Sequence, residues 1–161
     1  MNIEVLRVEK NEQQILHNIM QFYIYDFSQF INSIEVNEQG LYDPFNLEEY
    51  WIHENKHPFF IKVDDVLAGF VLVNSQTETS PASIAEFFIL KKYAGKGIGK
   101  VVARRIFDMF LGDWKITQIA KNYPAQAFWR SVIKDYTNDQ YSETYDNSRR
   151  SVQEFNNSEK K

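Results

Sequence analysis

The chain has 161 residues and a net charge of −4, with 43% hydrophobic and 25% charged residues. This length favours one domain, and the composition excludes extended disorder because enough apolar surface is present to offset chain entropy. Cysteine is absent, which excludes disulfides, thiolate metal sites and a cysteine nucleophile. The three histidines form no zinc-binding pattern, so we expect no metal.

The basic residues are concentrated in one segment of an otherwise acidic chain. Residues 91–105 hold six of them and no acid: Lys91, Lys92, Lys96, Lys100, Arg104 and Arg105. This distribution indicates one local anion site rather than a nucleic-acid surface, with a solvated basic helix face as the alternative. No apolar run is long enough to span a membrane, and the first twenty residues lack a signal-peptide pattern. We therefore expect a cytoplasmic protein that binds neither nucleic acid nor membrane.

Hydrophobic periodicity and turn residues predict an alternating order of elements. In chain order they are a strand over 2–8, a helix from 11 through 23, a short helix near 46–52, strands over 59–63, 66–73 and 84–90, a helix through 101–110, a strand over 114–120, a helix over 124–134, and strands over 141–145 and 151–155. Asp64-Asp65, between the strands over 59–63 and 66–73, predicts a hairpin turn. The order predicts an α/β (α+β) chain with a mixed, twisted sheet flanked by helices. We expect a single domain over residues 1–155 and a frayed polar tail over 156–161. The apolar run of the strand over 84–90 predicts burial on both of its faces.

The most informative segment is a glycine-rich turn between a strand and a basic helix, with the sequence YAGKGIGK over residues 93–100. Glycines allow a ligand to approach the backbone closely, and the free N–H groups at a helix N-terminus favour an anion. Lys96 and Lys100 add charge, so the turn suits a pyrophosphate. A P-loop is excluded because Val101 stands where Ser or Thr is needed, and the G-x-G-x-G spacing excludes a dinucleotide fingerprint.

This turn resembles the acetyl-coenzyme A motif of the GNAT superfamily of N-acetyltransferases, Arg/Gln-x-x-Gly-x-Gly/Ala. Gly97-Ile98-Gly99 matches its glycines, Ala94 stands where Arg or Gln is usual, and residues 85–90 look like the family's splayed fourth strand. The resemblance implies a GNAT-like acyl-CoA N-acyltransferase fold, in which the strands over 84–90 and 114–120 run parallel and splay apart at their C-terminal ends.

Acetyl-CoA is the co-substrate that this resemblance implies, with a binding site along the turn. Pantetheine would follow Ile89 and Leu90, and valine at Gly97 or Gly99 would fill the space of the anion. The pyrophosphate would lie on the backbone of Gly95, Lys96, Gly97, Ile98, Gly99 and Lys100.

A second motif, Asn122-x-x-Ala125-x-x-Phe128-Trp129, is similar to the family's Asn-x-x-Ala-x-x-Phe/Leu-Tyr helix. The resemblance implies that Asn122 contacts the pantetheine arm. Trp129 replaces the tyrosine that often protonates the leaving thiolate, and an indole cannot do so at neutral pH. Trp129 is therefore either a wall beside the cofactor or a core residue, and Tyr123 and Tyr136 are substitute acids to consider.

The resemblance implies transfer of an acetyl group from acetyl-CoA to a primary amine by direct attack, without a covalent enzyme intermediate. The reaction needs a base, and Glu86, on the strand leading into the glycine turn, is the candidate; its alternative is a carboxylate on the other sheet face. The departures at Ala94 and Trp129 motivate a second hypothesis, a non-catalytic acyl-CoA-binding regulatory module.

The acidic N-terminal region suggests a cationic acceptor, which is a small molecule or a peptide. Polyamines, aminoglycosides, amino acids and protein N-termini all remain open. A homodimer is one option for assembly. The acids to inspect, with a merely acidic surface as the alternative, are Asp26, Glu35, Glu38 and Asp43.

Overall fold

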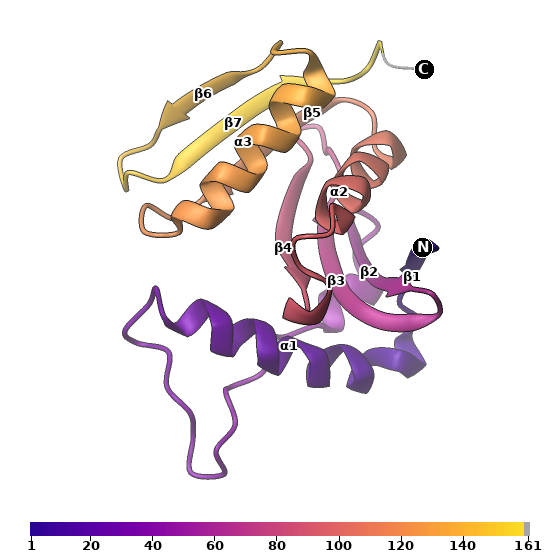
Figure 1. The fold of residues 1–161 in the computed structure, drawn as a ribbon, viewed down its shortest axis with the longest axis vertical. Coiled ribbons are helices and arrows are strands. Elements are labelled where there is room, and N and C mark those ends of the chain that lie inside the picture. Colours follow the sequence, from indigo (N-terminus) through magenta and orange to yellow (C-terminus); the bar gives the residue numbers. More distant parts are fainter. Residues whose placement is uncertain (160–161) are drawn as a thin grey trace.

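A computed structural model describes residues 1–159 of the chain, and the elements follow the predicted order (Figure 1). They are β1 (Ile3–Arg7), η1 (Lys10–Glu12), α1 (Gln13–Ser28), η2 (Glu48–Trp51), β2 (Lys56–Val63), β3 (Val66–Asn74), β4 (Ser83–Ile89), η3 (Lys91–Tyr93), α2 (Ile98–Met109), β5 (Asp113–Gln118), α3 (Tyr123–Thr137), β6 (Ser142–Tyr145) and β7 (Ser151–Asn156). The predicted α+β class, with sheets flanked by helices, is confirmed. The first helix is longer than predicted, because it continues past Tyr23 to Ser28.

The strands form two antiparallel sheets, in the orders β1-β2-β3-β4 and β5-β7-β6. The predicted hairpin turn at Asp64 and Asp65 joins β2 to β3, and both residues have positive φ, as a tight two-residue hairpin requires. β4 and β5 meet at a single parallel bridge between Ala82 and Trp114 and separate beyond it. The predicted parallel direction and splaying are therefore confirmed, but the strands belong to two sheets joined at one point, not to one continuous sheet.

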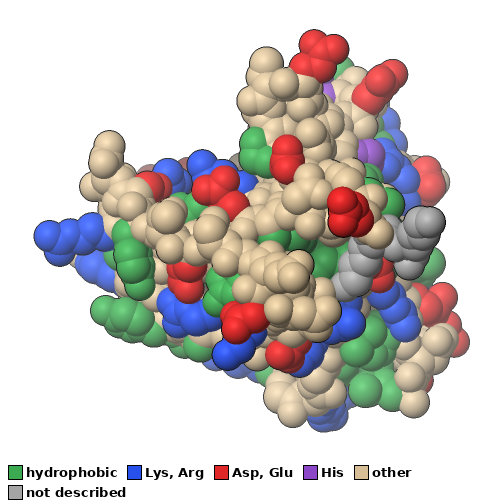
Figure 2. Space-filling model, turned by 90° about the horizontal axis from the view of Figure 1, so that it is seen from above, with side chains coloured by type: hydrophobic (Ala, Val, Ile, Leu, Met, Phe, Trp, Pro, Cys, Tyr) green, Lys and Arg blue, Asp and Glu red, His purple; other side chains and the backbone are tan. Residues whose placement is uncertain are grey.

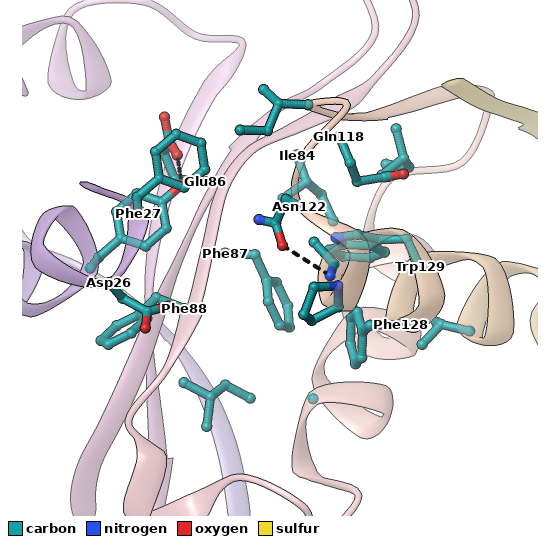
Figure 3. A pocket seen from close by; sticks show the side chains of 18 of the residues that line it. Asp26, Phe27, Ile84, Glu86, Phe87, Phe88, Gln118, Asn122, Phe128 and Trp129 are labelled. Atoms are coloured by element: carbon teal, nitrogen blue, oxygen red, sulfur yellow. Dashed lines mark hydrogen bonds between the residues drawn. The ribbon is translucent and has the colours of Figure 1, made fainter. Parts of the chain in front are cut away.

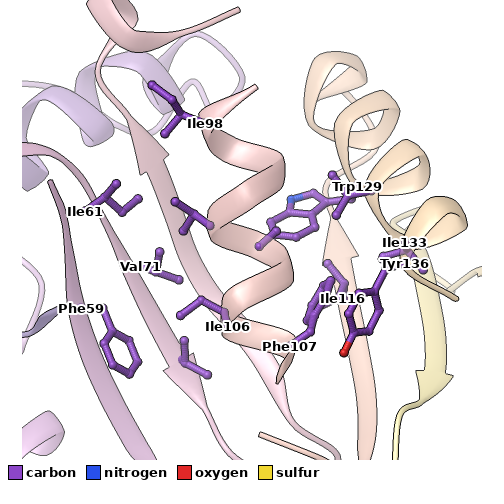
Figure 4. Packing of buried hydrophobic residues seen from close by; sticks show 14 of the residues in the cluster. Phe59, Ile61, Val71, Ile98, Ile106, Phe107, Ile116, Trp129, Ile133 and Tyr136 are labelled. Carbon is purple, nitrogen blue, oxygen red and sulfur yellow. The ribbon is translucent and has the colours of Figure 1, made fainter. Parts of the chain in front are cut away.

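Two apolar clusters occupy opposite faces of the first sheet. Alternate residues of β2 and β3 supply them, since Phe59 and Val71 belong to the first cluster whereas Phe60 and Phe70 belong to the second. α1 covers the second cluster through Leu16, Ile19 and Met20, which recur at helical spacing. The first cluster continues through α2 into the second sheet and α3, as Figure 4 shows.

β4 lies at the edge of the first sheet and is less buried than its apolar sequence predicts. Only Phe88 among its residues is buried, because the strand borders a cavity. Leu72 pairs with Glu86 and Val73 with Ile84, so Ala85 is an extra, bulged residue. The bulge changes the alternation: Glu86 and Phe88 point toward α1, whereas Ile84 and Phe87 point toward α3 (Figure 3).

The C-terminus is ordered further than predicted. Asn156 ends β7, and Asn157 is buried, with its side chain bonded to the Gly112 N–H, the Phe107 carbonyl and the Tyr136 hydroxyl. The expected frayed tail is therefore wrong for its first residues. Its last two residues, 160 and 161, lie outside the described part of the chain.

Candidate active site

A cavity of about 1200 Å³ opens where β4 and β5 separate (Figure 3). It has two halves, which meet across β4. The glycine-loop half is lined by Ile84, Phe87, Ile89, Gly95, Gly97, Ile98, Gly99, Lys100, residues 115–119, Asn122, Phe128 and Trp129. The α1 half is lined by Tyr23, Ile24, Asp26, Phe27, Gln29, Phe30, Ile34, Phe45, Glu86, Phe88 and Lys91.

The glycine loop offers open backbone at the start of α2. Gly95 and Gly97 have φ of +74° and +77°, and no atom lies within 4 Å of the position that a Cβ would take at either residue. Gly97 is the N-cap of α2, so the first N–H groups of this helix are free of intrahelical partners. This open, N–H-rich surface fits a pyrophosphate, whose charge the helix dipole also favours.

Gly99 has a steric role in the wall of the cavity. Its Cβ would lie 2.9 Å from Phe128 Cε1 and 3.4 Å from Ile89 Cδ1, so a side chain would collide with the wall of the cavity. Glycine at this position therefore allows α2 to pack closely against Phe128. The expectation that valine here would fill the space of the anion stays a prediction, and this collision is a second reason for glycine at the position.

The outer edge of β4 supplies a second backbone surface. β3 pairs with its inner edge, and within residues 1–159 its outer edge has only the bridge at Ala82. The N–H and C=O groups along this outer edge are therefore available to an extended ligand, as in the addition of a strand to a sheet.

Aromatic rings form the wall of the glycine-loop half. Phe87, Phe128 and Trp129 contact one another, with ring centroids 5.0–5.6 Å apart. Trp129 is 7% exposed and also packs against Phe107 of the core. Both sequence interpretations of Trp129 therefore describe its position, since it is part of the core and lines the cavity.

Asn122 lies at the entrance of α3 and caps it. Its Oδ1 accepts a hydrogen bond from the Ala125 N–H at 3.1 Å, which fixes the side chain at the helix N-terminus. Its amide nitrogen points into the gap between β4 and α3 (Figure 3), and it has no hydrogen-bond partner in the part of the chain that the structure describes. This group is free to donate to a ligand in the cavity.

Glu86 lies in the α1 half, where Tyr23 of α1 donates a hydrogen bond to its Oε2. Burial raises the pKa of Glu86, and the bond from Tyr23 partly opposes this effect. The pKa of Tyr23 is raised by burial and then by the charge of Glu86, so the phenol stays protonated as the donor. Glu86 faces away from Phe87 and Trp129, as its alternative interpretation states, and still lines the cavity.

Other sequence candidates differ in whether they reach the cavity. Leu90 and Lys96 do not line it, whereas the other nine site residues named from the sequence do. Tyr123 is 71% exposed, and Tyr136 is buried and donates to Asp108, which with burial raises its pKa to about 12. Neither tyrosine lines the cavity, so the structure places no substitute acid there from this pair.

The basic segment does not form one anion site. Arg105 bonds to the Ile3 carbonyl, Arg104 lies over the Tyr136 ring and Lys100 pairs with Asp135. Lys91 forms an ion pair with Asp26 at 3.6 Å. Acidic and basic side chains are also interspersed over the face seen in Figure 2. The open backbone of the loop, more than a cluster of lysines, is therefore the feature that suits an anion.

The acidic N-terminal region contributes less to the cavity than its composition suggests. Of the four acids named from the sequence, only Asp26 lines it, whereas Glu35, Glu38 and Asp43 are exposed outside it. Tyr23 and Phe27 also line the cavity, and neither is among the site residues predicted from the sequence. The signal in the sequence for both residues was the face of the first helix that holds its buried residues, which continues at helical spacing beyond them.

Two features are absent from the described residues. No group of three or more His, Cys, Asp or Glu side chains within residues 1–159 is arranged to hold a metal ion. Within the same residues, no helix has both the length and the apolar character needed to cross a bilayer.

Comparisons with known proteins agree on one family. The sequence model of the acetyltransferase (GNAT) family matches residues 19–132, well over half of the chain. A search of curated protein sequences finds no match. Among solved structures, an acetyltransferase from Thermus thermophilus superposes with a TM-score of 0.71 at 13% identity, covering 97% of each chain.

Two further structures are similar in fold. The PaiA N-acetyltransferase from Thermoplasma acidophilum, in complex with coenzyme A, has a TM-score of 0.62 at 14% identity, covering 97% of this chain and 99% of that one. A variant of spermidine N-acetyltransferase from Vibrio cholerae has a TM-score of 0.62 at 15% identity, covering 99% of this chain and 96% of that one. At these identities the likeness is one of fold alone.

Proposed function

Because this chain belongs to the GNAT acetyltransferase family, we propose that it transfers an acetyl group from acetyl-CoA to a primary amine. In this proposal the amine attacks the thioester directly, and the chain has no cysteine that could hold the acetyl group as an enzyme thioester. The observation that carries the proposal is the meeting of three features in one cavity: the open glycine loop, the outer edge of β4 and the partly buried carboxylate of Glu86.

The residues of the glycine-loop half fit coenzyme A by their chemistry. The N–H groups at the start of α2 and the open Gly95 and Gly97 suit its pyrophosphate. The outer edge of β4 near Ile89 suits the amides of pantetheine, and the Asn122 amide nitrogen adds a donor. Trp129 provides an apolar surface beside them.

Glu86 acts as the base in this proposal. Acetyl-CoA supplies the thioester that is attacked, and the acceptor must lose a proton before its nitrogen can form the amide bond. Glu86 takes that proton, directly or through water, and its raised pKa makes it a better proton acceptor than an ordinary carboxylate. Tyr23 holds Glu86 in place through its hydrogen bond.

The thiol that leaves needs one proton, and Trp129 cannot supply it. A thiol with a pKa near ~8.5, like that of cysteine, leaves readily as the thiolate, which then takes its proton from water. The reaction balances without a tyrosine at position 129. The ammonium loses one proton to Glu86 before attack, and the nitrogen loses a second proton as the amide bond forms and the thioester bond breaks. The thiolate gains one proton, so one proton is released to solvent overall.

The second candidate function is the non-catalytic acyl-CoA-binding module. Trp129, buried against Phe87 and Phe107 without an acidic hydroxyl, is the observation that favours it. Both functions use the glycine-loop half in the same way. They differ only in whether acetyl transfer follows binding.

The test is release of free thiol from acetyl-CoA by the full chain across a panel of primary amines, with the N-acetyl product identified by mass spectrometry. Turnover with at least one amine, in amounts that match the thiol released, is the expected result. Tight acetyl-CoA binding without thiol release across the whole panel would establish the binding module instead.

A further inference from the structure

The α1 half of the cavity presents apolar side chains that no core covers. Phe27, Phe30 and Ile34 line the cavity, are only partly buried and belong to neither apolar cluster of the fold. Phe27 lies 5.8 Å from Tyr23 and 6.2 Å from Phe30, measured between ring centroids. These rings form a continuous aromatic row that leads along α1 to the Tyr23–Glu86 pair.

Few charges accompany this row. The carboxylates that line the α1 half are those of Asp26 and Glu86, and Asp26 already has Lys91 at 3.6 Å. One uncompensated carboxylate thus remains, and it is Glu86, at the end of the row. A linear polyamine would need further carboxylates at intervals along its length, and Glu35, Glu38 and Asp43 lie outside the cavity.

We infer that the acceptor is a primary amine with one cationic nitrogen on an aromatic or branched apolar body. This inference rests on the proposed function and specifies its substrate class. The ammonium lies at Glu86 and the apolar body lies along Tyr23, Phe27 and Phe30. Aromatic faces also attract an ammonium group, so the row favours a cation at its inner end as well as apolar contact along it.

The physical basis of selectivity is apolar burial together with a single charge. Covering a ring-sized apolar body with Phe27, Phe30 and Ile34 removes apolar surface from water on both molecules. A second ammonium placed on this row would lose water without gaining a carboxylate, which disfavours binding. The acidic N-terminal region is therefore a solvated surface and not a polycation site.

Equilibrium binding tests this class without depending on catalysis. Isothermal titration of the full chain, with coenzyme A present, compares 2-phenylethylamine with spermidine, ethylamine and 2-phenylethanol. We expect 2-phenylethylamine to bind at least about tenfold more tightly than each of the others, because only it combines one cation with an apolar body. Equal or tighter binding of spermidine would overturn the inference.

Variants on one helix locate the effect. Phe27→Ala lowers the affinity for 2-phenylethylamine about tenfold by removing contact area, whereas Phe22→Ala leaves it unchanged because Phe22 is 60% exposed on α1 and outside the cavity. If the Phe27→Ala protein does not fold, Phe30→Ala takes its place in the same comparison. Equal losses of affinity for 2-phenylethylamine in the Phe22→Ala and Phe27→Ala proteins, or no loss in either, would contradict the inference.

Thiol release on the same amines separates this inference from the proposed function. Selective binding of 2-phenylethylamine without thiol release from acetyl-CoA would leave the inference standing and contradict the proposed transfer. Thiol release that is faster with spermidine than with 2-phenylethylamine would leave the proposed transfer standing and contradict the inference.

Discussion

The two halves of the cavity differ in the chemical groups that line them. The glycine-loop half consists of backbone groups and tightly packed rings, and its key positions, Gly95 and Gly97, lie two residues apart in the sequence. The α1 half consists of side chains, and its central pair, Tyr23 and Glu86, is separated by 63 residues. A backbone site tolerates few substitutions and suits a constant ligand, whereas a side-chain site can be changed one residue at a time and suits a ligand that defines specificity.

The largest expected effect of a single substitution is in the α1 half. Glu86→Gln keeps the shape of the side chain and removes the proposed base, so we expect kcat to fall about 10²- to 10⁴-fold, as for loss of a general base. Glu54→Gln, an exposed change outside the cavity, is the control and should have no effect. Wild-type kcat in the Glu86 variant would remove this residue from the mechanism.

The glycine-loop half is tested by a matched pair of glycines. Gly97 and Gly40 have φ of +77° and +76°, and neither has an atom within 4 Å of its Cβ position. Valine at either should therefore cost similar stability, about 1–3 kcal/mol, because both positions are left-handed. Only Gly97→Val should also weaken coenzyme A binding, by at least about thirtyfold or roughly 2 kcal/mol.

Unfolding free energy and coenzyme A affinity, measured on both variants, separate strain from loss of the site. Equal affinities for the folded Gly40→Val and Gly97→Val proteins would show that the loop does not hold coenzyme A.

The pH dependence of kcat tests the role of Glu86 in the α1 half through the direction in which its pKa is shifted. Glu86 works as a base only when ionised, and burial raises its pKa, so the rate falls with decreasing pH at a higher pH than for an ordinary glutamate. Tyr23→Phe removes the hydrogen bond that favours the ionised form, so it should raise this pKa further. The acid limb of the kcat profile then moves to higher pH, and a shift to lower pH would contradict the assignment.

The smallest expected effect concerns Trp129. Trp129→Tyr should raise kcat by less than about tenfold, or 1.4 kcal/mol of barrier, because water protonates the thiolate in the proposed mechanism. Trp129→Phe should change coenzyme A affinity more than kcat, since the residue contacts Phe87 and Phe128 in the wall. Single-turnover rates and titrations measure the two quantities. A gain of tenfold or more for Trp129→Tyr would show that a general acid limits the reaction.

The contrast between the halves also explains what the sequence could predict. The order of strands and helices and the glycine loop depend on local patterns: apolar periodicity, capping residues and glycine spacing. The hairpin at Asp64 and Asp65 and the helix after Asn122 were predicted for the same reason. Nine of the eleven proposed site residues line the cavity, mostly through this local motif.

The features that the sequence could not predict depend on contacts between distant segments of the chain. The bulge at Ala85, which points Glu86 toward α1, follows from strand pairing and has no signature in the apolar run around it. The separation of β4 from β5 leaves a single bridge that local pattern cannot distinguish from a full ladder. Tyr23 has the same helical spacing as its buried neighbours on α1, and only the folded chain shows that its hydroxyl reaches a carboxylate.

The central claim is that both halves of the cavity serve one acetyl transfer, in which the acetyl donor and the amine meet at Glu86. A bisubstrate ligand tests this claim most directly. In this ligand, coenzyme A is joined through an acetyl spacer to the nitrogen of 2-phenylethylamine, and its Kd is measured by titration against that of coenzyme A. Two linked sites in one cavity predict binding at least about 10²-fold tighter than coenzyme A alone, with most of the gain lost in Phe27→Ala. A conjugate that binds no more tightly than coenzyme A would show that the two halves do not form one site.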